Sequence, residues 1–491
     1  MVFDPVDENL PLEEADKRYL WHPFTQMKEW EQEKPVIIAE GKGSLIRDIY
    51  GNWYIDGVSS LWVNIHGHAR KEINEAMKKQ LDRIAHSTML GLSNVPAIQL
   101  AERLIKIVQT GTRDQGPGIR DKMTGPTLPE TPGPRSPVPD PQSLVPGPSL
   151  SRVFYSDNGS TSVEVALKMA FQYWKHKGAG RRNAFLSLNN AYHGDTIGAM
   201  SVGGIDIFHQ AFSPLFFRTF RAPSPYCYRC ELGLEHPGCG LSCVEKMEEL
   251  LHTHHDEIAA VILEPLVQAA GGMIVSPPGY LKAVRELCTK YRVLLIADEV
   301  ATGFGRTGRM FACEHESVIP DMLCLSKGIT GGYLPLAVTL AGDEIYKAFM
   351  GEYAELKTFF HGHSYTGNPL ACAAALACLD IFEKDDTLNE LQPKIGILEK
   401  WLREISALPH VGDARNRGLM AGVELVRDKN TREPYPWEEK RGWKAARHAM
   451  ENGVFLRPLG NVVVIMPPLS ITPEELGQLL RVIKAAIMAV T

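Results

Sequence analysis

Two side chains that could do chemistry together, an acid and a lysine, each follow a short apolar run. Asp298 comes directly after the run 293–297, and Lys327 stands two residues after the run 322–325. Continuous apolar runs of this length indicate strands buried on both faces of a sheet. Ligands of open α/β sheets bind at the carboxyl ends of the strands. The sequence therefore predicts that both side chains emerge at one sheet edge and face a ligand.

An acid beside a lysine has two interpretations. The first is an ordinary ion pair between two strand ends, which a lone Asp and a lone Lys would favour. The second is a site for pyridoxal phosphate, in which a lysine amine joins the cofactor's aldehyde and an acid keeps the pyridine nitrogen protonated. The flanking residues favour the second, because a Gly-Phe-Gly-Arg-Thr-Gly segment at 303–308 and a Ser-Lys-Gly segment at 326–328 accompany the pair.

Taken together, these segments resemble the signature of the class III aminotransferases, which are enzymes of fold type I. The resemblance rests on the apolar strand that ends in Asp-Glu, on the glycine-rich segment 303–308, and on the spacing to 326–328. It covers nearly the whole chain. It implies that the chain binds pyridoxal 5'-phosphate, that Lys327 is its catalytic lysine, and that Asp298 contacts the pyridine nitrogen.

Two further segments match cofactor-binding positions of the family. A strand leads into a turn rich in glycine and hydroxyl groups before a helix, where free amides and the helix dipole suit a phosphate. Such a turn taken alone is as well explained as an N-cap. The resemblance assigns Gly159 and Ser160 to the phosphate. It also makes Tyr192, in a Tyr-His-Gly-Asp motif, the residue that stacks on the pyridine ring, where the alternative is a tyrosine packed in a turn.

A glycine-rich segment at 361–369 precedes an alanine-rich helix that is expected to start near Leu370. The residues alone indicate no more than a turn. In the family this segment reaches across a dimer interface to the partner's active site. The resemblance therefore makes Gly362 a substrate contact and His363 and Ser364 cofactor contacts, and it implies an obligate homodimer with active sites at the interface.

The simplest interpretation of the tryptophans near the amino terminus is that they are aromatic residues of the hydrophobic core. The segments 21–27 and 59–62, however, are similar to those that line the substrate pocket in biotin-pathway members of the class. The substrate contacts implied by this similarity are Phe24, Leu61, Trp62 and Tyr192. Arg457, which alone would be a surface arginine, matches the family residue that holds the keto acid's carboxylate.

The similarity implies transfer of an amino group to 8-amino-7-oxononanoate, giving 7,8-diaminononanoate, with S-adenosyl-L-methionine as donor. Members that use this donor commonly have aromatic residues where Leu61 and Val464 stand, and tyrosine where Phe24 stands. L-lysine therefore remains an alternative donor, and another class III ω-amino acid transaminase remains an alternative enzyme. A non-catalytic cofactor-binding protein is less favoured, because it would have no need of Arg457.

Strand-like runs alternate with helical patterns through the middle of the chain, which predicts a mostly parallel α/β sheet. The expected domains are a segment 1–68 that joins the small domain and the substrate pocket, a large cofactor-binding domain 69–393, and a small α+β domain 394–491. One helix is expected to place Ile73, Met77, Leu81 and Ile84 on a single face. The closing helix should begin with a capping box at Thr472 and Glu475.

The proline-rich stretch 111–149 contains ten prolines among glycines, hydroxyl residues and scattered charges. It has too little apolar surface to offset the entropy of ordering it. We expect a flexible surface insertion without a catalytic role.

Composition excludes several classes of protein. The chain has 491 residues, 44% of them hydrophobic and 22% charged, with a net charge of −6. A mildly acidic globular protein without an apolar run of membrane-spanning length is expected to act on small molecules in the cytoplasm, and neither nucleic acid nor a membrane is an expected partner.

Nine cysteines, an odd number, fit reduced thiols better than a disulfide framework. Four of them, Cys227, Cys230, Cys239 and Cys243, are spaced closely enough to ligate zinc. Their spacing is looser than that of paired Cys-x2-Cys ligands, and a transaminase needs no metal. Free thiols are favoured, and no metal is expected.

Overall fold

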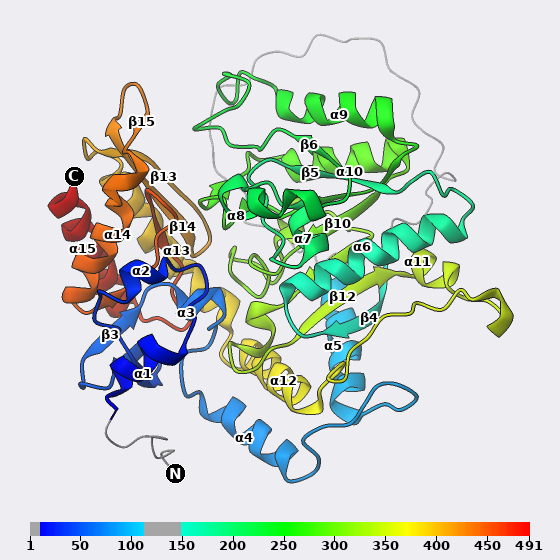
Figure 1. The fold of residues 1–491 in the computed structure, drawn as a ribbon, viewed down its shortest axis with the longest axis horizontal. Coiled ribbons are helices and arrows are strands. Elements are labelled where there is room, and N and C mark those ends of the chain that lie inside the picture. The colour runs from blue at the N-terminus through cyan, green and yellow to red at the C-terminus, as the bar shows by residue number, and fades with distance from the viewer. Residues whose placement is uncertain (1–9, 112–148) are drawn as a thin grey trace, which may run out of the picture.

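A seven-stranded sheet forms the centre of the larger part of the molecule in this computed structural model, which describes residues 10–111 and 149–491 (Figure 1). The strands lie in the order β4 (Leu150–Ser156), β12 (Ala337–Gly342), β11 (Met322–Leu325), β10 (Leu294–Asp298), β7 (Ile258–Leu263), β5 (Ala184–Leu188) and β6 (Thr219–Ala222). Only β12 is antiparallel to its neighbours. The predicted mostly parallel sheet is confirmed.

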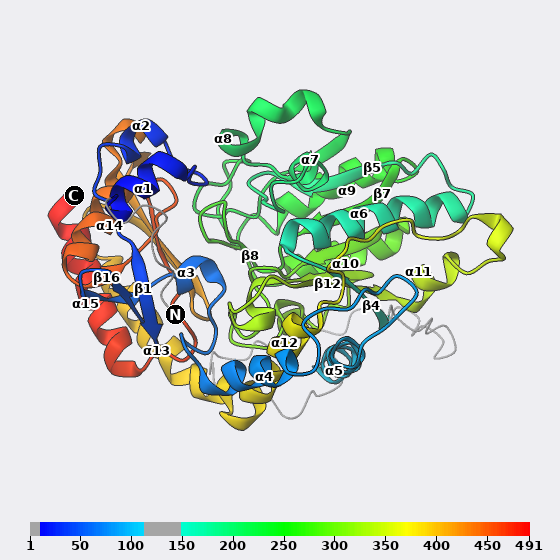
Figure 2. The same ribbon diagram turned by 60° about the horizontal axis from the view of Figure 1, so that its bottom comes forward.

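Helices cover both faces of this sheet (Figures 1 and 2). Alternate side chains of β10 enter two separate apolar clusters, since Leu294 and Ile296 pack with α6 (Gly159–His176) while Leu295 and Ala297 join the larger core. The larger core contains buried residues of α5 (Val95–Gly111), α9 (Ser242–His254), α10 (Tyr280–Tyr291) and α12 (Pro369–Lys384). Because β10 and β11 are buried on both faces, their carboxyl ends are held rigidly.

The smaller part contains two further sheets. One joins β1 (Ile38–Lys42), β2 (Leu45–Asp48), β3 (Trp53–Asp56) and β16 (Val454–Phe455), and the other joins β13 (Val411–Arg417), β14 (Met420–Asp428), β15 (Glu433–Pro434) and β17 (Val462–Ile465). The helices α13 (Thr387–Ile405), α14 (Arg441–Glu451) and α15 (Pro473–Val490) pack beside them (Figure 1). Since β16 pairs in parallel with β3, the first and last parts of the chain share one sheet.

The closing helix begins as predicted. Thr472 Oγ1 accepts a hydrogen bond from the amide of Glu475, whose carboxylate accepts one from the amide of Thr472. The expected face of the earlier helix is wrong in its second half. Helix α4 (Lys71–Leu81) ends before Ile84, and the side chain of Gln80 donates to the carbonyl of Ile84, so the chain turns back and both Leu81 and Ile84 are exposed.

The proline-rich stretch, expected to be a flexible insertion, lies outside the described residues apart from its two ends, Gly111 and Ser149. None of the described helices is long and apolar enough to cross a membrane.

Candidate active site

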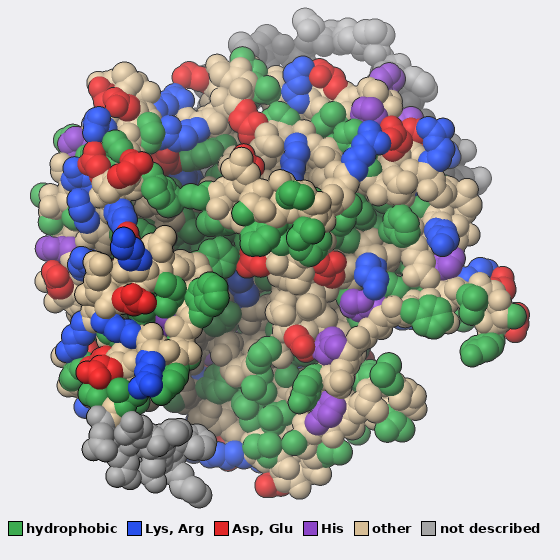
Figure 3. Space-filling view, viewed as in Figure 1, with side chains coloured by type: hydrophobic (Ala, Val, Ile, Leu, Met, Phe, Trp, Pro, Cys, Tyr) green, Lys and Arg blue, Asp and Glu red, His purple; other side chains and the backbone are tan. Residues whose placement is uncertain are grey.

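A cavity of about 460 Å³ opens at the carboxyl ends of the central strands. Figure 3 shows the molecule hollowed between its smaller part and the sheet body. The lining brings together six residues that the sequence analysis selected from distant segments, namely Trp62, Gly159, Ser160, Tyr192, Asp298 and Lys327. A volume in this range suits a cofactor or a small substrate.

Lys327 opens a short 3-10 turn directly after β11 and Ser326. Its φ of +44° lies in the left-handed region, which side chains other than glycine adopt at a cost. Burial lowers the pKa of Lys327, whereas Asp298 and Glu264 act in the opposite direction. A neutral amine is the form that attacks an aldehyde and accepts a proton, so this environment suits chemistry.

The ordinary ion-pair interpretation of Asp298 and Lys327 does not hold among the described residues. No carboxylate there lies within 4.0 Å of the Lys327 Nζ, which instead sits 4.8 Å from the ring centroid of Trp62. Trp62 is 7% exposed and has a left-handed φ of +67°. The lysine amine therefore faces the cavity beside an aromatic wall rather than a counter-ion.

Asp298 is held by a histidine that the sequence analysis did not assign. Its Oδ2 lies 2.7 Å from His193 Nδ1, and its Oδ1 accepts a hydrogen bond of 3.0 Å from the amide of Val300. The carboxylate is 4% exposed and the His193 side chain is fully buried, with Nε2 lacking a hydrogen-bond partner. His193 follows Tyr192 directly in the chain, so its motif was the available signal.

Tyr192 is fixed at both ends. Its hydroxyl donates to Asp195 Oδ2 at 2.7 Å, and its amide donates to Glu264 Oε1 at 3.1 Å. The His209 ring lies nearly parallel to it, with centroids 6.0 Å apart and planes 13° apart. A flat ring held in this way can present a face to a second aromatic ring.

Glu264 is a second cavity residue to which the sequence analysis gave no role. It directly follows β7, is 7% exposed, and accepts a hydrogen bond of 2.9 Å from the amide of Ala269 on its other oxygen. Burial, more than the nearby Asp298, raises the pKa of Glu264 to about 7, while His193 acts to lower it. This group can change protonation near neutral pH inside the cavity.

The opposite end of the cavity is the amino terminus of α6. Asn158 and Thr161 form a capping box there, and Ser160 Oγ accepts the amide of Asp195 at 3.1 Å. A Cβ on Gly159 would lie 2.6 Å from Val300, and one on Gly194 would lie 1.9 Å from Ser160 Oγ, so only glycine fits at either position. The free amides and the positive helix end suit a phosphate.

The fit to pyridoxal phosphate therefore rests on the whole cavity. A lysine amine, a buried carboxylate, a fixed aromatic ring and an anion-binding helix end all line the same space. These are the groups that would meet the aldehyde, the pyridine nitrogen, the ring face and the phosphate of that cofactor.

The structure does not place the remaining predicted site residues in the cavity wall. Phe24 and Leu61 are 56% and 49% exposed, and the Phe24 ring meets the edge of Phe208, which in turn meets the edge of Tyr192. Arg457 lies 5.8 Å from the ring centroid of Trp443, and burial lowers the pKa of Arg457. These residues lie outside the cavity that holds Lys327.

The segment containing Gly362, His363 and Ser364 also lies outside the cavity lining. His363 Nε2 is 3.4 Å from Asp157 of the same chain, which does line the cavity. Large exposed apolar side chains surround this segment, among them Leu90, Phe360 and Tyr365 at 71%, 74% and 60% exposure. Ser364 therefore reaches no cofactor position within one chain.

The four closely spaced cysteines line a second, much smaller cavity of about 20 Å³. All nine cysteines are unpaired, and burial is the main cause that raises the pKa of Cys243 to about 11. Within residues 10–111 and 149–491, no group of three or more His, Cys, Asp or Glu side chains is arranged to hold a metal ion.

Comparison with known proteins gives the same family along the whole chain. The model of the class III aminotransferases matches residues 26–116 and 141–487. The adenosylmethionine-8-amino-7-oxononanoate aminotransferase of Geobacter sulfurreducens is 52% identical over 488 residues, covering 99% of each chain.

Two solved structures are also similar over nearly the full length. The crystal structure of the enzyme of the same name from Methanocaldococcus jannaschii superposes with a TM-score of 0.86 at 46% identity, covering 99% of this chain and 100% of that one. A PLP-bound amine transaminase from an uncultivated Pseudomonas species gives a TM-score of 0.85 at 35% identity, covering 96% and 99%. Motifs, cavity and comparisons agree that the chain belongs to the class III aminotransferases, which are transaminases of fold type I that depend on pyridoxal phosphate.

Proposed function

We propose that this enzyme aminates 8-amino-7-oxononanoate to 7,8-diaminononanoate in biotin synthesis, with S-adenosyl-L-methionine as the amino donor. The observation that supports this most is the name shared by relatives at 52% identity from Geobacter sulfurreducens and 50% from Aquifex aeolicus, each covering at least 97% of both chains. The presence of Lys327 and Asp298 in one cavity also supports the proposal. The steady-state rate of 7,8-diaminononanoate formation tests the proposal directly.

In our proposal Lys327 is the catalytic base. Pyridoxal phosphate, when bound, supplies an aldehyde and an electron-accepting ring. The Lys327 amine would hold the aldehyde carbon until the donor arrives, and would then take the proton from the donor's Cα and deliver it to the cofactor carbon. Burial lowers the pKa of Lys327, which favours the neutral amine that both tasks require. Trp62, 4.8 Å from Nζ, limits where the freed amine can swing.

We assign Asp298 to the contact with the pyridine nitrogen of the cofactor. A buried carboxylate keeps a proton on that nitrogen, and the contact of 2.7 Å to His193 holds the carboxylate in orientation. We assign Tyr192 to stacking on the face of the cofactor's pyridine ring. Gly159 and Ser160 are assigned the phosphate, through the amides at the start of α6.

We infer that the active enzyme is a homodimer whose second copy completes each site. The exposed apolar side chains around 360–365 and at Leu90 need a cover. In this arrangement Ser364 of the partner subunit and the partner's His363 contact the cofactor phosphate. The partner's Gly362 contacts the substrate. Sedimentation should give a dimer mass, and a Ser364→Ala variant should bind pyridoxal phosphate more weakly.

The keto substrate is assigned to the mouth of the cavity. Phe24, Leu61 and Trp62 would contact its aliphatic chain, and Arg457 would bind its carboxylate through the guanidinium fork. Arg457 has no ion-pair partner among the described residues, so it is free to take one from the substrate. We also propose that residues 1–68 act with 394–491 on this substrate side, against a large cofactor-binding unit 69–393.

The donor has a specific second candidate, L-lysine. Leu61 and Val464 are aliphatic, and Val464 is fully buried in β17, so neither offers an aromatic face to adenine. Each such stacking contact is worth roughly 1 kcal/mol. A pocket with fewer aromatic faces would bind S-adenosylmethionine less tightly, and a linear diamino acid would lose nothing.

A half-reaction separates the two donors. The enzyme loaded with pyridoxal phosphate is mixed with each donor alone, and the absorbance of the bound cofactor is followed. Conversion by S-adenosylmethionine but not by lysine supports the proposal. Conversion by lysine but not by S-adenosylmethionine would make lysine the donor. Conversion by simple ω-amines instead of either would favour an ω-amino acid transaminase, the alternative suggested by similarity to the amine transaminase at 35% identity.

Two smaller assignments complete the proposal. We place the enzyme in the cytoplasm, because nine unpaired thiols suit a reducing compartment. We also propose that the cysteines at 227–243 are free thiols without a metal. Metal analysis of the purified protein should find substoichiometric zinc, and one tightly held zinc per chain would refute this assignment.

A further inference from the structure

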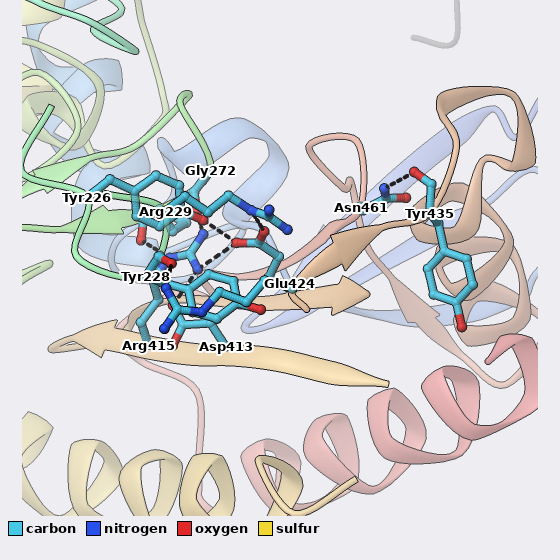
Figure 4. A network of polar contacts seen from close by, with 11 residues as sticks. Tyr226, Tyr228, Arg229, Gly272, Asp413, Arg415, Glu424, Tyr435 and Asn461 are labelled. Carbon is cyan, nitrogen blue, oxygen red and sulfur yellow. Dashed lines mark hydrogen bonds and ion pairs between the residues drawn. The ribbon is translucent and has the colours of Figure 1, made fainter. Parts of the chain in front are cut away.

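An arginine in the smaller part of the molecule is hydrogen-bonded to a turn in the larger part. Arg415, in β13, donates from Nε to the carbonyl of Met273 at 2.9 Å and from Nη2 to the carbonyl of Gly272 at 2.6 Å (Figure 4). Its side chain is 9% exposed. Arg415 therefore uses two of its N–H groups on the main chain of a single turn in the other part of the molecule.

That turn forms part of the cofactor cavity. It joins the short strands β8 (Val267–Gln268) and β9 (Ile274–Val275), and its residues Ala269 and Ala270 line the cavity. The amide of Ala269 donates to one oxygen of Glu264, whose other oxygen accepts the amide of Tyr192. A continuous path of contacts thus leads from Arg415 through the turn and Glu264 to Tyr192.

The turn has almost no room to move. A Cβ on Gly271 would lie 2.5 Å from the carbonyl of Asn190, two residues before Tyr192. On the other side, a Cβ on Gly422 of β14 would lie 3.0 Å from Met273. The turn is packed between the small sheet and the segment that leads to Tyr192. A shift of the small sheet would therefore displace the turn and, with it, the segment before Tyr192.

Arg415 is itself held from behind. Its Nη1 lies 2.6 Å from Asp413 and 3.0 Å from Glu424, and Glu424 also accepts hydrogen bonds from the Tyr226 hydroxyl and Arg229 (Figure 4). Burial acts to raise the pKa of Glu424, but Arg415, Tyr226 and Arg229 outweigh it, so the pKa lies below its usual range. An ionised, 7%-exposed carboxylate therefore fixes the guanidinium orientation.

We propose that Arg415 is a positioning residue of this transaminase, which sets the 269–273 turn and, through Glu264, the placement of Tyr192 against the cofactor ring. The inference rests on the proposed cofactor site and is independent of the keto substrate. Lysine cannot replace it, because one ammonium cannot reach two carbonyls and two carboxylates in the planar geometry of the guanidinium fork.

The test compares Arg415→Met and Arg415→Lys with Arg427→Met. Arg427 is on the adjacent strand of the same hairpin but is 50% exposed and makes only surface ion pairs, so it is the matched control. Both Arg415 variants should weaken pyridoxal phosphate binding and speed hydrogen exchange in residues 266–275. Misplacement of a reacting group costs about 100-fold, which is the fall in kcat/KM expected for Arg415→Met at saturating cofactor.

A double-mutant cycle with Glu264→Gln tests the path itself. If Arg415 acts through Glu264, the two losses in kcat/KM should not multiply, since one change already breaks the path. Independent losses would overturn the path. If the variants lose thermal stability but keep wild-type cofactor affinity, hydrogen exchange and kcat/KM, Arg415 is only structural. If Arg415→Met does not fold, the same measurements on Arg415→Lys decide the question. Should the wild type not aminate 8-amino-7-oxononanoate, the proposed substrate fails, while cofactor affinity and exchange still decide this inference.

Discussion

The floor of the cavity and its mouth are built in opposite ways. On the floor, Asp298, His193 and Glu264 are nearly or fully buried, and each has a partner within the same chain. At the proposed substrate mouth, Phe24 and Leu61 are about half exposed, and Arg457 lacks an ion-pair partner among the described residues. The difference means that the buried polar groups of the cavity hold one another in place within one chain, whereas the groups at the proposed mouth have few partners of their own.

The largest effect should come from the floor. Lys327→Ala removes the only lysine amine among the described residues that line the cavity, and we expect turnover to fall by at least about 10⁴-fold. Cofactor affinity should fall much less, because the phosphate contacts remain. Lys347→Ala, which removes a surface ion-pair partner, is the control. Turnover within tenfold of wild type would refute the site.

Asp298→Asn should be the next largest change. The amide keeps the shape of the carboxylate but not its charge, so the pyridine nitrogen loses the group that keeps it protonated. We expect kcat to fall by roughly 100-fold to 1,000-fold with the fold intact, as for a preorganised electrostatic contact. The spectrum of the bound cofactor should change as well. A rate within a few-fold of wild type would make Asp298 structural.

Arg457→Met probes the mouth and should leave the floor untouched. A charged hydrogen bond to a carboxylate contributes about 1.5–3 kcal/mol, so KM for 8-amino-7-oxononanoate should rise roughly 10- to 100-fold. The donor half-reaction should keep its rate, because it does not involve that carboxylate. If both half-reactions slowed equally, the division between floor and mouth would be wrong. Arg447→Met, at an exposed ion pair, is the control.

On stability, Glu264→Gln should have an effect that is small and depends on pH. The carboxyl ionises near 4.5 in the unfolded chain and at about 7 in the folded one, so its protonated form stabilises the fold and this contribution is lost as pH rises through 7. Between pH 6 and 8 the wild type should lose about 1 kcal/mol more unfolding free energy than the variant. Equal losses would place the carboxyl pKa outside this range.

The sequence predicted the floor better than the mouth, for a physical reason. Buried strands require unbroken apolar runs, so β11 lies where the run 322–325 placed it and β10 is displaced by one residue from 293–297. His193 and Glu264 were missed because their roles come from contacts between distant segments. The motif that contains Tyr192 marks the position of His193, but it does not reveal that His193 contacts Asp298, 105 positions further along the chain.

The predicted helix face was wrong for a different reason. Exposure of Leu81 and Ile84 depends on where α4 stops, and the Gln80 side chain ends it by bonding to Ile84. Periodicity records which residues share a helix face but not whether the helix continues. The roles of Phe24, Leu61 and Ser364 likewise depend on a substrate or a second copy, which a single chain does not contain.

The sheet shared by the first and last parts of the chain has a consequence for synthesis on the ribosome. Ser59 donates to the carbonyl of Met466, 407 positions later, and Arg306 bonds the carbonyls of both Asn64 and Pro467. Because contacts of such sequence separation form late, the edge of β3 that pairs with β16 must stay unpaired until β16 has been translated. The sheet that β3 and β16 share thus forms late in synthesis, and until then the nascent protein carries an open strand edge that a chaperone could shield.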